Sequence, residues 1–161
     1  RQMCIRDRYN ITEKRERSAV YRVLMSSEVK DDLQERINQK IIIEQKYKDK
    51  DYSAKQLADD LGTNVRYISA VCAERFHTNY CGLVNAQRVN EAMSMLVDPR
   101  YLKYRIEDIG EKVGFANRQS FYGAFFRFKN MTPRQYRQNY IESHPELAKP
   151  KGTRGRSRKS A

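Results

Sequence analysis

Two segments of the chain follow the same residue pattern, and this internal repeat restricts the fold more than any other feature. In each copy an aromatic residue precedes apolar residues at helical spacing, and a glycine then leads into a second apolar helix pattern. The copies lie 52 residues apart up to the glycine and 53 after it, so Tyr52, Leu57, Ala58, Leu61, Gly62, Asn64 and Ile68 correspond to Tyr104, Ile109, Gly110, Val113, Gly114, Asn117 and Phe121. A short helix, a turn containing glycine and a second helix form a helix-turn-helix, so the sequence predicts two of them.

The first copy opens with a clear helix-start signal. In YSAKQL, Ser53 can cap a helix whose third residue is Gln56, which together predict a capping box. Tyr52 and Leu57 flank this cap as a hydrophobic staple. Gly62 should end the helix, because glycine readily adopts the left-handed conformation found after a helix C-terminus.

The second helix of each copy has a predicted cap and a predicted buried face. Asn64 and Asn117 stand where asparagine caps helices. The expected inward residues are Ile68, Val71, Cys72 and Phe76 in the first copy, and Phe121, Ala124, Phe125 and Phe128 in the second. The small residues Ala58 and Gly110 should let the paired helices approach closely.

Further helices precede, join and follow the two copies. Val29, Leu33, Ile37 and Ile41 predict a long first helix opened by Ser27. Residues 80–97 keep a helical period until Asp98-Pro99, and a helix of this length would be about 27 Å long. Thr132, Pro133 and Gln135 predict a cap and first turn for a final helix over 133–141, with Met131 and Tyr136 as its staple. Strand signals are nearly absent, so we expect an all-α fold with about seven helices.

The segment GFANRQSFYGAFFRFKNMTPRQYR, residues 114–137, resembles the closing signature of the DNA-binding domain of the AraC/XylS family of bacterial transcription regulators. YSAKQLADDLGTNVRYIS and the repeat support this resemblance, which extends from about Ile37 to Arg137. It implies seven helices in two helix-turn-helix units joined by a long helix, with the third and sixth helices in adjacent major grooves. His77 and Asn130 depart from the family pattern, since both stand where glycine is usual.

The resemblance also implies which residues contact DNA. They are Asn64, Val65, Arg66, Tyr67, Ser69 and Ala70 in the first unit, and Asn117, Arg118, Gln119, Ser120 and Tyr122 in the second. Arginine can read guanine and glutamine can read adenine, although a phosphate contact or a solvated surface charge is the alternative for each. Tyr67 has an alternative reading as packing against the first helix. Gly123 stands where some relatives carry a long basic side chain, and Tyr122 is its candidate substitute.

The formal net charge of +12 favours a polyanionic partner, of which double-stranded DNA is the expected one. Six cations lie in the final stretch without an acidic residue, as candidate phosphate contacts: Lys149, Lys151, Arg154, Arg156, Arg158 and Lys159. A passive, solubilising tail is the alternative. We expect a disordered or artefactual segment over 1–25, a DNA-binding domain over 26–141 and a disordered basic tail over 142–161. Within the domain, the two helix-turn-helix units should cover about 53–76 and about 106–128.

Other function classes lack support in the sequence. Cys4, Cys72 and Cys81 form no metal-binding or disulfide pattern, no catalytic motif occurs, and no apolar run is long enough for a membrane span. The sequence therefore predicts a non-enzymatic regulator without cofactor or metal, located in the bacterial cytoplasm at the nucleoid. RNA polymerase is a second candidate partner. A nucleoid-like protein that binds DNA without sequence selection is the alternative. Effector, target genes, oligomeric state and membership of a longer chain stay open.

Overall fold

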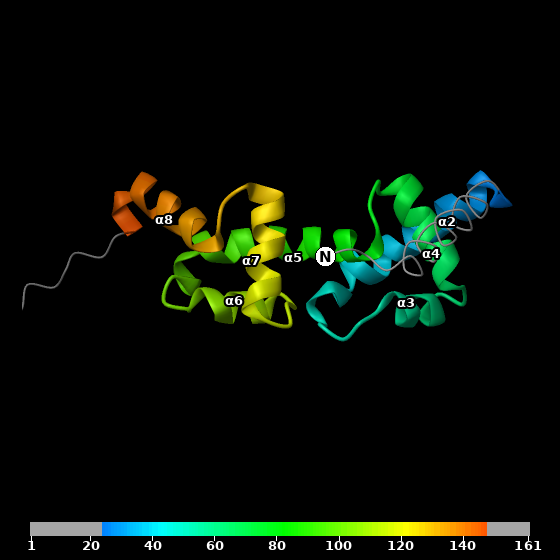
Figure 1. Cartoon of the computed structure of the whole chain (residues 1–161), viewed down its shortest axis with the longest axis horizontal. Coiled ribbons are helices and arrows are strands. Elements are labelled where there is room, and N and C mark those ends of the chain that lie inside the picture. The colour runs from blue at the N-terminus through cyan, green and yellow to red at the C-terminus, as the bar shows by residue number, and fades with distance from the viewer. Residues whose placement is uncertain (1–23, 148–161) are drawn as a thin grey trace, which may run out of the picture.

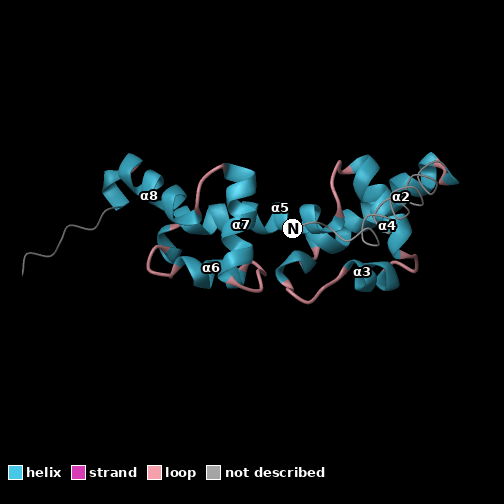
Figure 2. Ribbon diagram, in the orientation of Figure 1, coloured by secondary structure: helices cyan, strands magenta, loops and turns pink. Residues whose placement is uncertain are grey.

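The computed structural model describes residues 24–147, and every regular element in that range is a helix (Figures 1 and 2). The seven α-helices of this range are α2 (Ser27–Asn38), α3 (Ala54–Asp60), α4 (Val65–Arg75), α5 (Tyr80–Val97), α6 (Ile106–Lys112), α7 (Arg118–Lys129) and α8 (Pro133–Ser143). Short turns of other helix types are η1 (Gln39–Ile43), η2 (Lys46–Lys48), η3 (Pro99–Tyr101) and η4 (Pro145–Leu147). The predicted all-α fold is confirmed.

The long helix α5 joins two groups of helices, as Figure 1 shows: α2, α3 and α4 lie around one end, and α6, α7 and α8 around the other. Each group has its own hydrophobic core. Leu83 and Val84 of α5 belong to the first core, whereas Val89, Ala92 and Leu96 belong to the second. The helix is therefore both the predicted connector and a part of each core.

The four caps predicted at the starts of α3, α4, α7 and α8 are confirmed. The Ser53 hydroxyl accepts from the amide of Gln56 at 3.3 Å, and the Gln56 side chain accepts from the Ser53 amide at 2.8 Å. Thr132 and Gln135 form the same capping box at the start of α8. Asn64 and Asn117 each accept from the amide three residues on, at 3.0 and 2.8 Å.

Four helices are followed by a residue in the left-handed backbone conformation. Gly62 and Gly114 follow α3 and α6 with φ of 65° and 109°. His77 and Asn130 adopt φ of 54° after α4 and α7, which is the conformation that glycine would adopt without a Cβ penalty. The two departures from the family pattern therefore adopt the left-handed conformation that glycine favours.

The first helix differs from the prediction at its start. Ser26, not Ser27, is its N-cap, since the Ser26 hydroxyl accepts from the amide of Val29. Ser27 instead accepts a hydrogen bond from Arg75 of α4 at 3.2 Å. Val29 is 49% exposed and belongs to no core, whereas Leu33, Ile37 and Ile41 are buried as predicted.

The end of the second unit also differs. Phe121 and Phe125 are fully buried, but Phe128 is 44% exposed. The ring of Phe125 packs edge-on against Tyr136 of α8 at 5.6 Å, and α7 then continues one turn past this core. Helix α8 extends to Ser143 and η4 follows it, so helical structure continues beyond residue 141, where the final helix was expected to end.

Candidate nucleic-acid interface

Helix α7 separates its apolar and polar residues onto opposite sides. Phe121, Ala124 and Phe125 are buried, whereas the cap Asn117 and the first-turn residues Arg118, Gln119 and Ser120 are all exposed. The buried side is tightly packed, because a Cβ atom on Gly110 of α6 would lie only 2.5 Å from the ring of Phe121. The small residue predicted at this crossing is thus required, and the first turn of α7 is held in place by the core beneath it.

Arg118 contacts Glu107 and Tyr122 while its side chain stays exposed to solvent. Its side chain is 67% exposed, and its Nε lies 3.5 Å from a carboxylate oxygen of Glu107 at the start of α6. The guanidinium carbon is 4.8 Å from the centre of the Tyr122 ring, which itself packs edge-on against Phe121. Tyr122 therefore connects the exposed arginine to the buried aromatic core, which reduces the number of positions open to the arginine.

The corresponding residues of α4 are less uniformly exposed. Asn64, Val65 and Arg66 are exposed, and Ser69 is half-buried. Tyr67 is half-buried and packs against the first core, which favours the packing reading of this residue. Ala70 is only 1% exposed, so its side chain has no free surface to offer a base.

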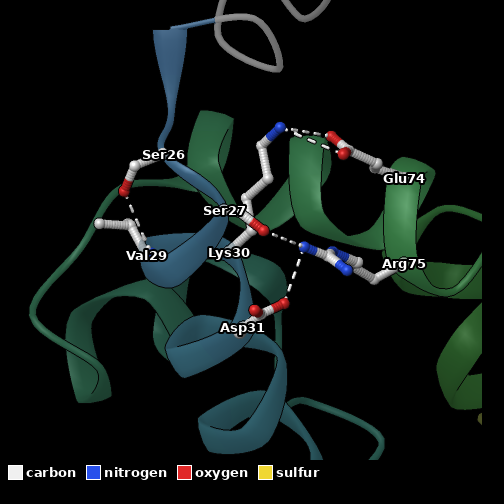
Figure 3. Close-up of polar contacts among 7 residues, drawn as sticks. All are labelled: Ser26, Ser27, Val29, Lys30, Asp31, Glu74 and Arg75. Atoms are coloured by element: carbon white, nitrogen blue, oxygen red, sulfur yellow. Dashed lines mark hydrogen bonds and ion pairs between the residues drawn. The ribbon is translucent and has the colours of Figure 1, made fainter.

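Helix α2 contacts α4 near the C-terminal end of α4 (Figure 3). Lys30 of α2 lies 2.9 Å from Glu74, one turn beyond Ala70, and Arg75 lies 2.7 Å from Asp31. Arg75 also donates to the Ser27 hydroxyl, as Figure 3 shows. These contacts join residues 44 or more positions apart, so a helix pattern read from α4 alone could not reveal them.

The six tail cations that were predicted to contact phosphate lie outside the described residues. They are Lys149, Lys151, Arg154, Arg156, Arg158 and Lys159.

Sequence analysis missed Arg88, a residue of α5 that connects the two units. Its Nε donates to the carbonyl oxygen of Tyr47 at 2.6 Å, and its Nη2 donates to that of Asp49 at 3.1 Å. Its guanidinium lies 5.6 Å from the ring centre of Phe115, in the turn of the second unit. Burial lowers the pKa of Arg88 from its ordinary value, but an arginine stays charged at neutral pH.

Gly114 completes this junction between the units. A Cβ atom there would lie 2.5 Å from the carbonyl oxygen of Tyr47 and 2.8 Å from that of Lys48. The turn of the second unit therefore touches the backbone of η2, whose Tyr47 belongs to the first core. Lys48 also pairs with Glu91 of α5 at 3.5 Å. A single arginine among polar residues gave no sequence signal for this junction, because its acceptors are backbone carbonyls.

A second arginine, Arg137 of α8, holds the far end of α5 in a similar way. It donates to the carbonyl oxygens of Leu96, Tyr104 and Tyr101 at 3.2, 2.8 and 3.2 Å. Burial lowers the pKa of Arg137 from its ordinary value. Three acceptors on one planar guanidinium fix the connection between α5 and α6 against the final helix.

Three features besides the interface bear on the class of protein: the buried cysteine, possible metal-binding groups and possible membrane-spanning helices. Cys72 is fully buried, and burial raises the pKa of its thiol to about 11, which fits the predicted role as a small core residue. Residues 24–147 contain no group of three or more His, Cys, Asp or Glu side chains that could hold a metal ion. In the same range no helix combines the length and apolar character needed to cross a bilayer.

Two tandem helix-turn-helix units, each presenting the exposed N-terminal turn of its second helix, define a DNA-binding protein. The model of the family described as "Helix-turn-helix domain" matches residues 57–139, about half of the chain. The chain therefore belongs to this family, in its AraC type, and the resemblance found in the sequence is confirmed. The family comprises DNA-binding domains of transcription regulators and is not a family of enzymes.

Solved structures share this fold. The C-terminal domain of AraT, a response regulator from Geobacillus stearothermophilus, is 21% identical with a TM-score of 0.55, over 72% of this chain and 88% of that one. The C-terminal domain of the two-component response regulator yesN from Fusobacterium nucleatum is 24% identical with a TM-score of 0.51, over 69% and 99%. A Listeria innocua protein of unknown function is 24% identical with a TM-score of 0.53, over 58% and 86%. A search of curated proteins gave no match.

Proposed function

We propose that the protein is a sequence-specific transcription regulator that inserts α4 and α7 into adjacent major grooves of double-stranded DNA. The observation that carries this proposal is the pair of capped, exposed helix starts at opposite ends of α5. A helix of 18 residues is about 27 Å long, and successive major grooves on one face of DNA recur at about 34 Å. The separation therefore suits two half-sites one helical turn apart.

The exposed residues divide by chemistry into base-reading and phosphate-binding groups. Arg66 and Arg118 can each donate two hydrogen bonds to guanine, and Gln119 can pair with adenine. Val65 and Ser69 would make short contacts, and Ser120 and Tyr122 would border the second site. Asn64 and Asn117 act as caps, and the free amides that follow them favour phosphate. Ala70 and Tyr67 are omitted from the base-reading set because they serve packing.

The rest of the chain has its own place in the proposed function. The described helices up to η4 form the DNA-binding unit, and the six tail cations add contacts to phosphate without sequence choice. RNA polymerase is a candidate partner for activation, and the cytoplasm is the expected compartment. The charge of +12 also supports the second candidate, a nucleoid-like protein that coats DNA by charge alone.

Selection from a random double-stranded DNA pool tests the proposal against this second candidate. A sequence-specific regulator should enrich a bipartite motif whose half-sites lie about 10 base pairs apart. An Arg66→Ala variant should lose preference in one half-site, and an Arg118→Ala variant in the other. Binding without any enriched motif would reject the proposal and favour the nucleoid-like protein.

A further inference from the structure

Helix α7 exposes an aromatic side chain that neither core uses. Phe126 is 54% exposed, although its neighbour Phe125 is fully buried. Phe128 is also exposed, but it continues the line of the buried residues beyond the end of the core. Phe126 lies on the other side of the helix, and within the described residues it belongs to neither hydrophobic core.

Phe126 shares a face with the proposed base-reading residues. Gln119, Tyr122, Gly123 and Phe126 occur at positions i, i+3, i+4 and i+7, which form one stripe on an α-helix. Recognition helices of homeodomains read bases with residues at the same spacing. A helix lying in the major groove can therefore bring all four positions to the edges of the bases.

The surface beside Phe126 is open. A Cβ atom on Gly123 would meet nothing within 4 Å, so no side chain fills the space one turn before the ring. The equivalent stripe of α4 is Arg66, Ser69, Ala70 and Ala73, at the repeat distance of 53 residues. The first unit has alanine where the second has Phe126, so this apolar surface belongs to the second unit alone.

The charges of α7 indicate what kind of partner its exposed side fits. Helix α7 contains Arg118, Arg127 and Lys129 and no acidic residue, and the exposed Arg134 follows in α8. A second copy of this chain would bring its own charge of +12 against these cations. DNA offers the complementary arrangement, because phosphates line both sides of the major groove while thymine methyl groups project into it.

We propose that Phe126, with the open surface at Gly123, is a subsite for the 5-methyl group of a thymine in the second half-site. This inference rests on the proposed function and names one base that the site selects. Gln119 and Phe126 are seven residues apart, which is about 10.5 Å along the helix axis. The thymine should therefore lie about three base pairs from the base read by Gln119.

The test uses the motif obtained by selection and replaces its thymines, one at a time, with deoxyuridine. This exchange removes only the methyl group and keeps every hydrogen-bonding atom. For the parent protein, one thymine of the second half-site should show an affinity loss of about fourfold, the value expected for one buried methyl group. For Phe126→Ala, thymine and uracil at this position should bind equally.

The matched control is Phe128→Ala, which removes another exposed phenylalanine of α7 from a different side. It should keep the discrimination between thymine and uracil, and both variants should melt like the parent. The inference is overturned if no second-half thymine is sensitive to deoxyuridine, if the motif requires no thymine there, or if Phe126→Ala keeps the discrimination. Unchanged DNA binding by Phe126→Ala with altered sedimentation of the free protein would assign the face to self-association.

Failure of the inference is distinguishable from failure of the proposed function. A pool that yields no motif rejects the proposed function, and the inference with it. A clear motif whose thymines all tolerate deoxyuridine rejects the inference alone.

Discussion

At the scale of single residues, the two units leave different amounts of their second helices free. Lys30 and Asp31 of α2 pair with Glu74 and Arg75 of α4, and Ala70 of the same helix is buried. The first-turn residues of α7 are all exposed, from Arg118 to Ser120. We therefore expect the second unit to supply more of the base discrimination than the first.

Arg118 and Gln119 are the residues at which this expectation is tested. Changing either to alanine should weaken binding by about 1–3 kcal/mol at one or two base pairs, because a specific hydrogen-bonded pair is lost. Competition binding against single-base variants of the motif measures the effect. The control is Arg134→Ala, which removes one positive charge from an exposed position of α8 and should leave the base preference unchanged. An affinity loss that is equal for every DNA sequence would mean that the altered residue holds phosphate.

Single residues also show which parts of the structure could be predicted from the sequence and which could not. Caps were predictable because a capping side chain and the backbone amide that donates to it lie three residues apart, as Ser53 and Gln56 do. The exposure of Val29 and Phe128 and the burial of Ala70 were not predictable, because they depend on how the helices pack against one another. The contacts of Arg88 could not be predicted for the same reason, since its carbonyl acceptors are 39 and 41 residues away.

At the scale of the elements, α7 depends on two packing contacts that can be changed separately. Phe125→Ala should lower the free energy of unfolding by about 3–5 kcal/mol, because it leaves a cavity in the second core. Gly110→Ala should lower it by about 1–3 kcal/mol, because the new methyl group would overlap the Phe121 ring. Urea unfolding followed by circular dichroism measures both.

Phe128→Ala serves as the control for these variants, since its exposed ring should contribute within about 0.5 kcal/mol. A Phe125→Ala variant that unfolds at the parent's urea concentration would contradict the core assignment. A Gly110→Ala variant with the parent's stability would contradict the close approach of α6 and α7. It would mean that the two helices can move apart without a loss of folding free energy.

At the scale of the whole molecule, charge outside the described residues should set the salt dependence of binding. Ending the chain after Leu147 removes six cations, and each phosphate neutralised adds nearly one unit to the slope of log affinity against log salt. The truncated protein should show a flatter slope and the same preferred motif. Titrations at several salt concentrations measure this. Equal slopes would make the tail passive, and a changed motif would mean that it reads bases.

The relative position of the two units should depend on Arg88 as well as on α5. The helix fixes the distance between the units, while Arg88 joins η2, which packs into the core of the first unit, to Phe115 of the second unit. Two recognition helices held in one arrangement should tolerate little variation in the spacing of their half-sites. We therefore expect the parent to lose affinity sharply when one base pair is inserted between them.

Arg88→Ala should make binding less sensitive to that insertion, because the first unit is then free to shift against the second. Arg88→Lys should fall between the two, since an ammonium group cannot reproduce the planar fork that donates to the carbonyls of Tyr47 and Asp49. Affinities for sites with zero, one and two inserted base pairs measure the effect. Arg100→Ala removes the same charge from an exposed position beside Asp98 and should behave like the parent. If Arg88→Ala kept the parent's spacing profile, the stiffness of α5 alone would set the arrangement of the two units.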